Sequence, residues 1–325
     1  MVMSKRTVLI TGGLGFIGWH CVLRWLKDDW HVIIVDNCSS NVVEPDDVFG
    51  ARVIVSNIAD LSPFDFESVD LVLHLASPVG PVGVLKHAGR MGRMIMDDTT
   101  AVINIAAEHD CPLVFVSTSE IYGHRDGKSY LVEDDDKVLR GSYTVRNEYA
   151  VAKLLAEIVV TNYAAVHERF RYQLIRPFNV AGYMQGIDGG FCLPRFVNQA
   201  RNNEPLTVYG TGQQLRAFTW VQDIVEGMWL TANAPAEHWN KHWNIGNEWN
   251  ETSILALAEM VIEASGSSST IQHVDPKTLH GDLFSEAPEK IPNSERIRAD
   301  LGWFPKGSIE FVVGEVLETN GHRAW

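Results

Sequence analysis

A tyrosine and a lysine stand four residues apart, at Tyr149 and Lys153, in the segment YAVAK. If this segment is helical, the phenol and the amine lie on one face of the helix, one turn apart. A nearby amine favours the phenolate, which can take a proton from a bound hydroxyl group. The spacing arises easily by chance, so the alternative interpretation is a surface tyrosine and lysine on a helix. The neighbouring motifs decide between the two.

A polar segment, STSE at 117–120, ends a predicted strand, and YAVAK lies on the helix expected after it. Ligands of a doubly wound sheet bind beyond the carboxyl ends of its strands. The hydroxyl groups and the carboxylate of this segment are therefore expected beside the Tyr149–Lys153 pair. The alternative interpretation of Glu120 is a carboxylate that is solvated or that only supports a neighbouring side chain.

Three glycines occur at Gly12, Gly15 and Gly18 in the segment TGGLGFIG, after a predicted strand and before a predicted helix. Such glycines allow a tight turn, close approach to a pyrophosphate and close packing of helix on sheet. The helix N-terminus then offers N–H groups and a positive dipole end to the phosphates. A plain strand–helix turn is the alternative, but the context favours a dinucleotide site.

An aspartate, Asp36, ends the next predicted strand, 24 residues after Gly12. A carboxylate at this place accepts hydrogen bonds from the adenosine ribose of a dinucleotide. It also repels a 2′-phosphate, and Asn37 and Cys38 supply no cation that would hold one. The site therefore favours NAD over NADP.

The elements that must position these residues alternate between short apolar runs and helical patterns. This alternation predicts an α/β fold, a Rossmann doubly wound parallel sheet that is buried on both faces. The predicted strands are 7–11, 31–36, 52–55, 71–76, 113–117 and 172–176, and the long predicted helices are 91–109 and 147–168.

After about residue 178 the alternation weakens, and shorter helical segments are predicted at 194–202, 221–233 and 254–265. We expect an NAD-binding Rossmann domain over 1–178, to which some later segments return. Residues 179–325 are expected to form mainly a smaller α/β substrate-binding lobe. The acidic run at 133–136 is interpreted as a solvated loop.

Composition excludes several classes of function. With 46% hydrophobic and 21% charged residues, the chain is neither disordered nor fibrous. A net charge of −14 makes it a poor ligand for nucleic acid or for an anionic membrane surface, and neither partner is expected. No uninterrupted apolar run is long enough to span a membrane. The four cysteines are scattered without metal-ligand spacing, so we expect no metal and a cytoplasmic, reducing location.

Taken together, the motifs resemble the extended short-chain dehydrogenase/reductase family, in its nucleotide-sugar epimerase, dehydratase and decarboxylase group. The resemblance runs in order over most of the chain and is carried by TGGLGFIG, Asp36, HLAS at 74–77, STSEIYG at 117–123, YAVAK, RPFNVAG at 176–182 and LGWFP at 301–305. It implies a Rossmann domain, tightly bound NAD and a nucleoside-diphosphate sugar as substrate. It also implies a homodimer in which helices 91–109 and 147–168 of two copies form a four-helix bundle.

The resemblance also assigns roles to single residues. Tyr149 is expected to take a proton from the C4 hydroxyl of the sugar, Lys153 to favour the phenolate, and Thr118 to bind the same oxygen, with Ser119 and Glu120 as further catalytic residues. NAD is expected to contact Gly12, Gly15, Phe16, Ile17, Gly18, Asp36, Asn37, Asn57, Ile58, Leu75, Ala76, Ser77, Ser117, Tyr149, Lys153 and Pro177. The substrate is expected to contact Thr118, Asn179, Arg195, Arg216 and Lys290.

Oxidation at C4 opens three routes: loss of CO₂ from a C6 carboxylate, reduction from the other face as in a 4-epimerase, or 4,6-dehydration. The segment Thr118-Ser119-Glu120 resembles the strand end of UDP-glucuronate decarboxylases and of GDP-mannose 4,6-dehydratases. The segments HLASP, EPLTVYG and Arg216-Ala-Phe favour the decarboxylases. Two departures oppose that assignment: YAVAK stands in place of Tyr-Asp-Glu-Gly-Lys, and Phe191 in place of an arginine. Asp98 stands where many relatives have asparagine, a departure that concerns the cofactor side of the site. An NAD-binding sensor or scaffold without turnover is the non-enzyme alternative.

Overall fold

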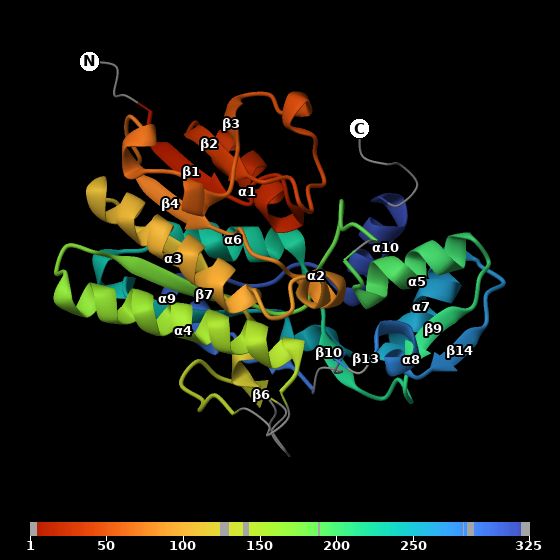
Figure 1. The fold of residues 1–325 in the computed structure, drawn as a ribbon. Coiled ribbons are helices and arrows are strands. Elements are labelled where there is room, and N and C mark those ends of the chain that lie inside the picture. Colours follow the sequence, from red (N-terminus) through yellow and green to blue (C-terminus); the bar gives the residue numbers. More distant parts are fainter. Residues whose placement is uncertain are drawn as a thin grey trace.

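Seven parallel strands form the central sheet of the computed structural model, which describes residues 5–123, 130–138, 143–187, 189–281, 283–284 and 289–319 (Figure 1). Their order is β12-β7-β5-β4-β1-β2-β3, and every neighbouring pair is parallel. The strand order reverses between β1 and β4, as in a doubly wound Rossmann sheet, so the predicted fold class is confirmed. The strands are β1 (Thr7–Thr11), β2 (His31–Asp36), β3 (Ala51–Val55), β4 (Leu71–His74), β5 (Leu113–Val116), β7 (Tyr172–Pro177) and β12 (Lys241–Ile245).

Helices cover both faces of the sheet because successive strand residues point to opposite sides and both sides are apolar. On β1, Leu9 faces α3 (Met91–Glu108) and α4 (Val145–Val166), whereas Val8 and Ile10 face α1 (Phe16–Lys27) and α6 (Val221–Ala232). The two long predicted helices agree with α3 and α4 to within two residues at each end. Although it lies far along the chain, β12 forms an edge strand of the sheet, beside β7. The later helix α9 (Glu295–Leu301) packs in the same core as α1 and α6.

A second group of elements lies beside the sheet, at the right in Figure 1, and has its own apolar core. It contains α5 (Cys192–Arg201), β9 (Leu206–Tyr209), α7 (Ile254–Ser265), β14 (Ile271–Val274) and α10 (Ile309–Thr319). β9 and β14 pair in parallel, and α5, α7 and α10 pack on one another. The chain after residue 178 therefore contributes both to this smaller lobe and, through α6, β12 and α9, to the central sheet.

Short elements connect these two parts. The short strands are β6 (Tyr130–Leu131), β8 (Val180–Ala181), β10 (Leu215–Ala217), β11 (Thr219–Trp220), β13 (Glu251–Ser253) and β15 (Ile291–Pro292), and the short helices are α2 (Gly80–Lys86) and α8 (Pro276–His280). The 3₁₀-helices are η1 (Pro45–Asp47), η2 (Ile58–Asp60), η3 (Pro63–Asp65), η4 (Ser119–Tyr122), η5 (Ala236–His238) and η6 (Glu248–Asn250).

The acidic run at 133–136 is not wholly solvated, contrary to the sequence-based interpretation. Asp134 and Asp136 are exposed, but Glu133 is buried. Its Oε1 accepts a hydrogen bond from the Asn244 backbone N–H at 2.9 Å, which compensates the carboxylate for lost hydration.

The helix α4 is long and apolar enough to cross a membrane by length and composition alone, although charged residues interrupt its apolar sequence. It nevertheless packs against α3 and the sheet, and it carries the buried charged side chains of Lys153 and Glu157. These features identify it as a core helix. Its outer face exposes Val151, Leu155 and Ile158.

Candidate active site

The glycine-rich turn brings the start of α1 against the end of β1. Gly12 has a φ of +70°, and a Cβ atom there would lie 2.8 Å from the Ala76 nitrogen. A Cβ atom on Gly18 would lie only 2.0 Å from the Gly12 oxygen, so any side chain would force α1 away from the sheet. Phe16 and Ile17 form the first turn of α1, and no side chain caps that helix at Gly15. Its first N–H groups can therefore bind an anion.

Asp36 lies next to this turn, at the carboxyl end of β2. Its Oδ2 accepts the Leu14 N–H at 3.0 Å and its Oδ1 accepts the Cys38 N–H at 2.9 Å. A carboxylate has about four acceptor sites, so ribose hydroxyl groups can still bind it. The adjacent Asn37 donates to the side chain of Asn57 at 2.9 Å, which places the turn after β3 beside the turn after β2. Ile58, in contrast, is buried in the core beneath α3.

The turn after β4 is fixed to the glycine-rich turn by Thr11. The Leu75 N–H donates to the Thr11 carbonyl at 3.1 Å, and the Ala76 N–H donates to Thr11 Oγ1 at 3.2 Å. Thr11 Oγ1 also lies 2.7 Å from Nδ1 of the buried His74. Leu75, Ala76 and Ser77 are thereby held at the same edge of the sheet as the glycines.

The strand β5 ends at the same edge, in the segment that contains Ser117 and Thr118. The Ser117 N–H donates to the Ile175 carbonyl of β7 at 2.7 Å. The Ser117 Oγ is buried and has no hydrogen-bond partner among the described residues. Thr118 caps η4, because its Oγ1 accepts the Glu120 N–H at 3.2 Å.

Tyr149 and Lys153 project from α4 toward the end of β5, and both side chains are buried. Burial raises the pKa of Tyr149 above its usual range, while interactions with Thr118 and Ser77 act in the opposite direction. The structure thus brings the Tyr149 phenol together with the hydroxyl groups of Ser77, after β4, and Thr118, after β5.

Lys153 is anchored to the backbone, since its Nζ donates to the Val116 carbonyl at 3.0 Å. Burial lowers the pKa of Lys153 to about 8, against the opposing charges of Asp98 and Glu157. Burial and the charge of Glu120 raise the pKa of Tyr149, and the hydrogen bonds with Thr118 and Ser77 lower it. Lys153 is not among these groups, so its expected lowering of the Tyr149 pKa is not seen in the protein alone.

Glu120 lies between two cations. The Arg146 Nη1 is 2.7 Å from its Oε1, and the Lys290 Nζ pairs with the same oxygen. Burial alone would raise the pKa of Glu120, but Arg146 and Lys290 lower it well below its usual range. Arg146 was not singled out in the sequence. Its place three residues before Tyr149, on the same helix face, is the signal that could have identified it.

The predicted substrate residues Asn179, Arg216 and Lys290 are close together. Arg216 and Lys290 form a backbone bridge, and both side chains are buried. The side-chain amide of Asn179 donates to the Ala217 carbonyl at 3.1 Å and to the Lys290 carbonyl at 3.5 Å. Pro177 ends β7 two residues before Asn179. Asn179, Arg216 and Lys290 therefore lie near the carboxyl ends of the strands, toward which Tyr149 projects from α4.

Arg195 belongs to a separate cluster in the smaller lobe. Its Nη1 donates to the Tyr209 hydroxyl at 2.8 Å, its Nη2 donates to the Thr207 carbonyl at 3.1 Å, and its guanidinium stacks on the Tyr209 ring at 4.2 Å. The Tyr209 hydroxyl also lies 2.8 Å from Nε2 of His280. Tyr209 and His280 were missed in the sequence because only the fold brings them to Arg195.

The arrangement fits a dinucleotide. The glycine-rich turn leaves a cradle that a Cβ atom would fill, the uncapped start of α1 suits a pyrophosphate, and Asp36 suits a ribose. The Ser117 Oγ, which has no hydrogen-bond partner in the described part of the chain, is a buried hydroxyl that a ligand can satisfy. Tyr149 lies at the same sheet edge, where a bound sugar hydroxyl can lose its proton.

Comparison with known proteins agrees with this geometry. The family model described as the NAD dependent epimerase/dehydratase family matches residues 8–246. The chain is 30% identical over 321 residues to a UDP-N-acetyl-alpha-D-glucosaminuronate decarboxylase of Bacillus cytotoxicus, covering 97% of each chain. It is also 30% identical to UDP-glucuronic acid decarboxylase 4 of Arabidopsis thaliana, covering 94% of this chain and 67% of that one.

Solved structures share the fold. A UDP-glucose 4-epimerase of Thermotoga maritima superposes with a TM-score of 0.85 at 22% identity, covering 97% of this chain and 98% of that one. The protein Pal of Bacillus thuringiensis superposes with a TM-score of 0.83 at 27% identity, covering 97% and 99%. The chain belongs to the NAD-dependent epimerase/dehydratase family, within the extended short-chain dehydrogenases/reductases, and is an enzyme that uses NAD.

Proposed function

We propose that this enzyme is a nucleotide-sugar decarboxylase that acts on a UDP-linked uronic acid. The observation that carries the proposal is the Glu120 carboxylate beside Tyr149, paired with both Arg146 and Lys290. Cations at this position can also bind the carboxylate of a uronic acid. The full-length similarity to proteins named as decarboxylases of UDP-uronic acids supports the same reaction.

The roles of the site residues follow from their places. Gly12, Gly15 and Gly18 with the start of α1 would hold the pyrophosphate of NAD, and Asp36 would hold its adenosine ribose. Residues 1–178 would thus form the NAD-binding domain, and 179–325 mainly the substrate-binding lobe. Arg216 is assigned to the substrate diphosphate, and Lys290 to the carboxylate at C6 rather than to a phosphate.

NAD, when bound, would supply the chemistry of reversible hydride exchange with C4 of the sugar. Tyr149 accepts the proton of the C4 hydroxyl at its phenolic oxygen, while Thr118 and Ser77 orient that oxygen. In the loaded enzyme, the charge of Lys153 together with that of oxidised NAD would favour the phenolate against the effect of burial. After the C4 ketone has formed, the C5–C6 bond breaks and releases CO₂, because the sugar is then a β-keto acid. C5 would take up a proton from solvent in place of the lost CO₂, and Tyr149 would return its own proton to the C4 oxygen.

The charge state of Glu120 favours decarboxylation over dehydration. A 4,6-dehydration needs a proton donor for the departing C6 hydroxyl group. Glu120 has a pKa well below its usual range, so it carries no proton to donate near neutral pH. Epimerisation of a neutral sugar makes no use of two cations at this place. The structural neighbours named as epimerases are at most 23% identical and support the fold only.

We also propose that the enzyme is cytoplasmic and that two copies pair through α3 and α4 as a four-helix bundle. Val151, Leu155 and Ile158 are spaced at three or four residues and form an exposed apolar stripe on α4. Burial of this stripe against a second copy would remove it from water. Light scattering of the wild-type protein and of L155E would test the pairing, with a monomeric variant as the expected result.

Mass spectrometry after incubation with NAD and either UDP-glucuronate or UDP-N-acetylglucosaminuronate tests the reaction. We expect a product lighter by one CO₂. Loss of water instead would mean a dehydratase, and an unchanged mass with a shifted NMR spectrum would mean an epimerase. Firmly bound NAD with no reaction of any UDP-, GDP- or dTDP-sugar would favour a non-catalytic NAD-binding protein. Each of these three results would overturn the proposal.

A further inference from the structure

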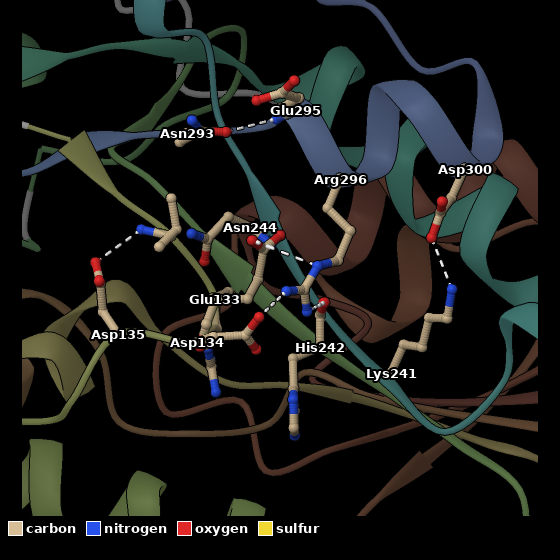
Figure 2. Close-up of polar contacts among 12 residues, drawn as sticks. Glu133, Asp134, Asp135, Lys241, His242, Asn244, Asn293, Glu295, Arg296 and Asp300 are labelled. Carbon is tan, nitrogen blue, oxygen red and sulfur yellow. Dashed lines mark hydrogen bonds and ion pairs between the residues drawn. The ribbon is translucent and has the colours of Figure 1, made fainter.

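Glu133 is a buried carboxylate to which the proposed reaction gives no role. Its side chain is 3% exposed, and it follows β6 in the segment drawn in Figure 2. The Asn244 N–H donates to Oε1 at 2.9 Å, and the Arg296 Nε lies 3.7 Å from Oε2. Burying a carboxylate is costly, so its two partners indicate a specific task for this side chain.

Arg296, on α9, holds the same segment from outside. Besides Glu133, it pairs with Asp134 at 2.5 Å between Nη2 and Oδ2 (Figure 2). The two acidic residues differ in environment, because the Asp134 side chain is 78% exposed and the Glu133 side chain is buried. An exposed pair contributes little, so Glu133 makes the contact that fixes the segment.

The segment is also held from inside, by β7 and β12. Asn244 is fully buried, and its Nδ2 donates to the Leu131 carbonyl at 2.8 Å. Arg176 donates from Nη1 to the Glu133 carbonyl at 2.9 Å. Together with the Glu133 carboxylate, these bonds fix β6 to the carboxyl end of the sheet.

Through β6, this attachment reaches Lys290. Leu131 pairs in parallel with Pro292 of β15, and the Asn293 N–H donates to the Leu131 carbonyl at 2.9 Å. Lys290 directly precedes β15, and its ammonium pairs with Glu120. The pairing of β6 with β15 therefore connects Glu133, which follows β6, to Lys290, which precedes β15.

We propose that Glu133 is a positioning residue that holds β6 against β15, and thereby holds Lys290 where it recognises the substrate carboxylate. The inference rests on the proposed function, since it presumes that Lys290 binds a uronic acid. It assigns to a residue outside the active site a part in choosing charged sugars over neutral ones.

Calorimetric titration of the NAD-loaded enzyme with UDP-glucuronate and with UDP-glucose tests this inference. Every protein carries Y149F, so that the sugar is bound but not consumed, and Y149F alone serves as the wild-type reference. The ratio of the two Kd values reports the carboxylate contact alone, because the nucleotide is the same. We expect a wild-type preference for UDP-glucuronate that falls about tenfold in E133A, a loss typical of a charged hydrogen bond, with unchanged affinity for UDP-glucose and NAD. E133Q keeps an acceptor for the Asn244 N–H but loses the charge, and we expect a smaller fall. D134N, which alters the exposed partner of Arg296, is the matched control and should keep the full preference.

The outcomes separate the two ideas. A wild-type enzyme without preference overturns the carboxylate site and this inference with it. A wild-type preference that persists unchanged in E133A overturns the inference alone, and if E133A does not fold, an unchanged preference in E133Q does so. An equal loss of affinity for both sugars and for NAD also overturns it, because that pattern means general damage.

Discussion

The Lys290 ammonium and the Glu120 carboxylate form an ion pair that joins the C-terminal part of the chain to the end of β5. The Lys290 side chain is only 4% exposed, and burial lowers its pKa to about 8 against the opposing charge of Glu120. Lys290 is therefore mainly protonated near neutral pH. In the proposed reaction, this charge is assigned to the substrate carboxylate at C6.

Replacing Lys290 should impair the reaction with uronic acids. We expect K290A to lower kcat/KM for UDP-glucuronate by about 10- to 100-fold, the effect of losing a hydrogen bond to a charged group, mainly through KM. K290R should retain part of the activity. Steady-state kinetics of both variants would measure this, with K27A, a change of an exposed lysine on α1, as control. A K290A enzyme with wild-type kinetics would remove Lys290 from the site.

Tyr149 should be essential for proton transfer but not for binding. We expect Y149F to lower kcat by about 10²- to 10⁴-fold, the usual contribution of a general base, while NAD remains bound. The transient absorbance of NADH on mixing with substrate should disappear. Y163F changes another tyrosine of α4, packed against His167 and Phe170, and should leave the rate unchanged. Normal turnover by Y149F would contradict the assigned base.

Local patterns in the sequence were enough for the sheet and for much of the site. The glycines of the first turn follow the apolar strand β1, and Asp36 ends the apolar strand β2. Short local patterns therefore placed these residues at the carboxyl ends of their strands. Glu133 shows where this reasoning fails. Its acidic neighbours indicate a solvated loop, and only the pairing of β6 with β15 and the partner Asn244 explain its burial.

Arg195 and Arg146 show the same limit. The resemblance assigns Arg195 to the substrate, which stays a prediction, and the structure adds a stack on Tyr209 that the sequence does not indicate. No sequence motif indicated Arg146, although it forms an ion pair with Glu120. Side chains from distant segments meet through the tertiary fold, and a single sequence does not specify which long-range pairs form.

Asp98 should set the alkaline limit of activity through Lys153. Burial raises the pKa of Asp98 to about 6, so it is mostly ionised above neutral pH, where its charge opposes the loss of the Lys153 proton. Activity that needs protonated Lys153 should fall as pH rises through about 8. D98N removes the negative charge, lowers the pKa of Lys153 and should move this fall to lower pH.

The pH dependence of kcat/KM for the wild type and D98N would measure that shift. Lys290 also loses its proton near this pH, but that contribution is common to both proteins. D97N alters the neighbouring residue, which pairs with exposed Arg93, and should leave the profile unchanged. A profile of D98N that coincides with the wild type would disprove the coupling.

The buried pair of Arg176 and Glu157 should dominate stability on the α4 side of the sheet. Two hydrogen bonds join them, at 3.0 and 2.6 Å, and both side chains are less than 5% exposed. We expect E157A to lower the free energy of unfolding by about 3–5 kcal/mol, because Arg176 would keep a buried charge without its partner. Urea denaturation would measure it. D97A breaks a pair whose side chains are 88% and 53% exposed, and it should cost at most about 1 kcal/mol.

Gly18 should be required for NAD because it brings α1 close to the end of β1. An alanine Cβ there would lie 2.0 Å from the Gly12 oxygen, so the helix must shift away from the turn. The N–H groups at its start would then no longer face the pyrophosphate, and we expect G18A to bind NAD at least about tenfold more weakly. Titration of the purified proteins with NAD would measure this. G92A places a Cβ atom on α3 where nothing lies within 4 Å, and it should bind NAD normally. Equal affinity in G18A would mean that the start of α1 does not hold the pyrophosphate.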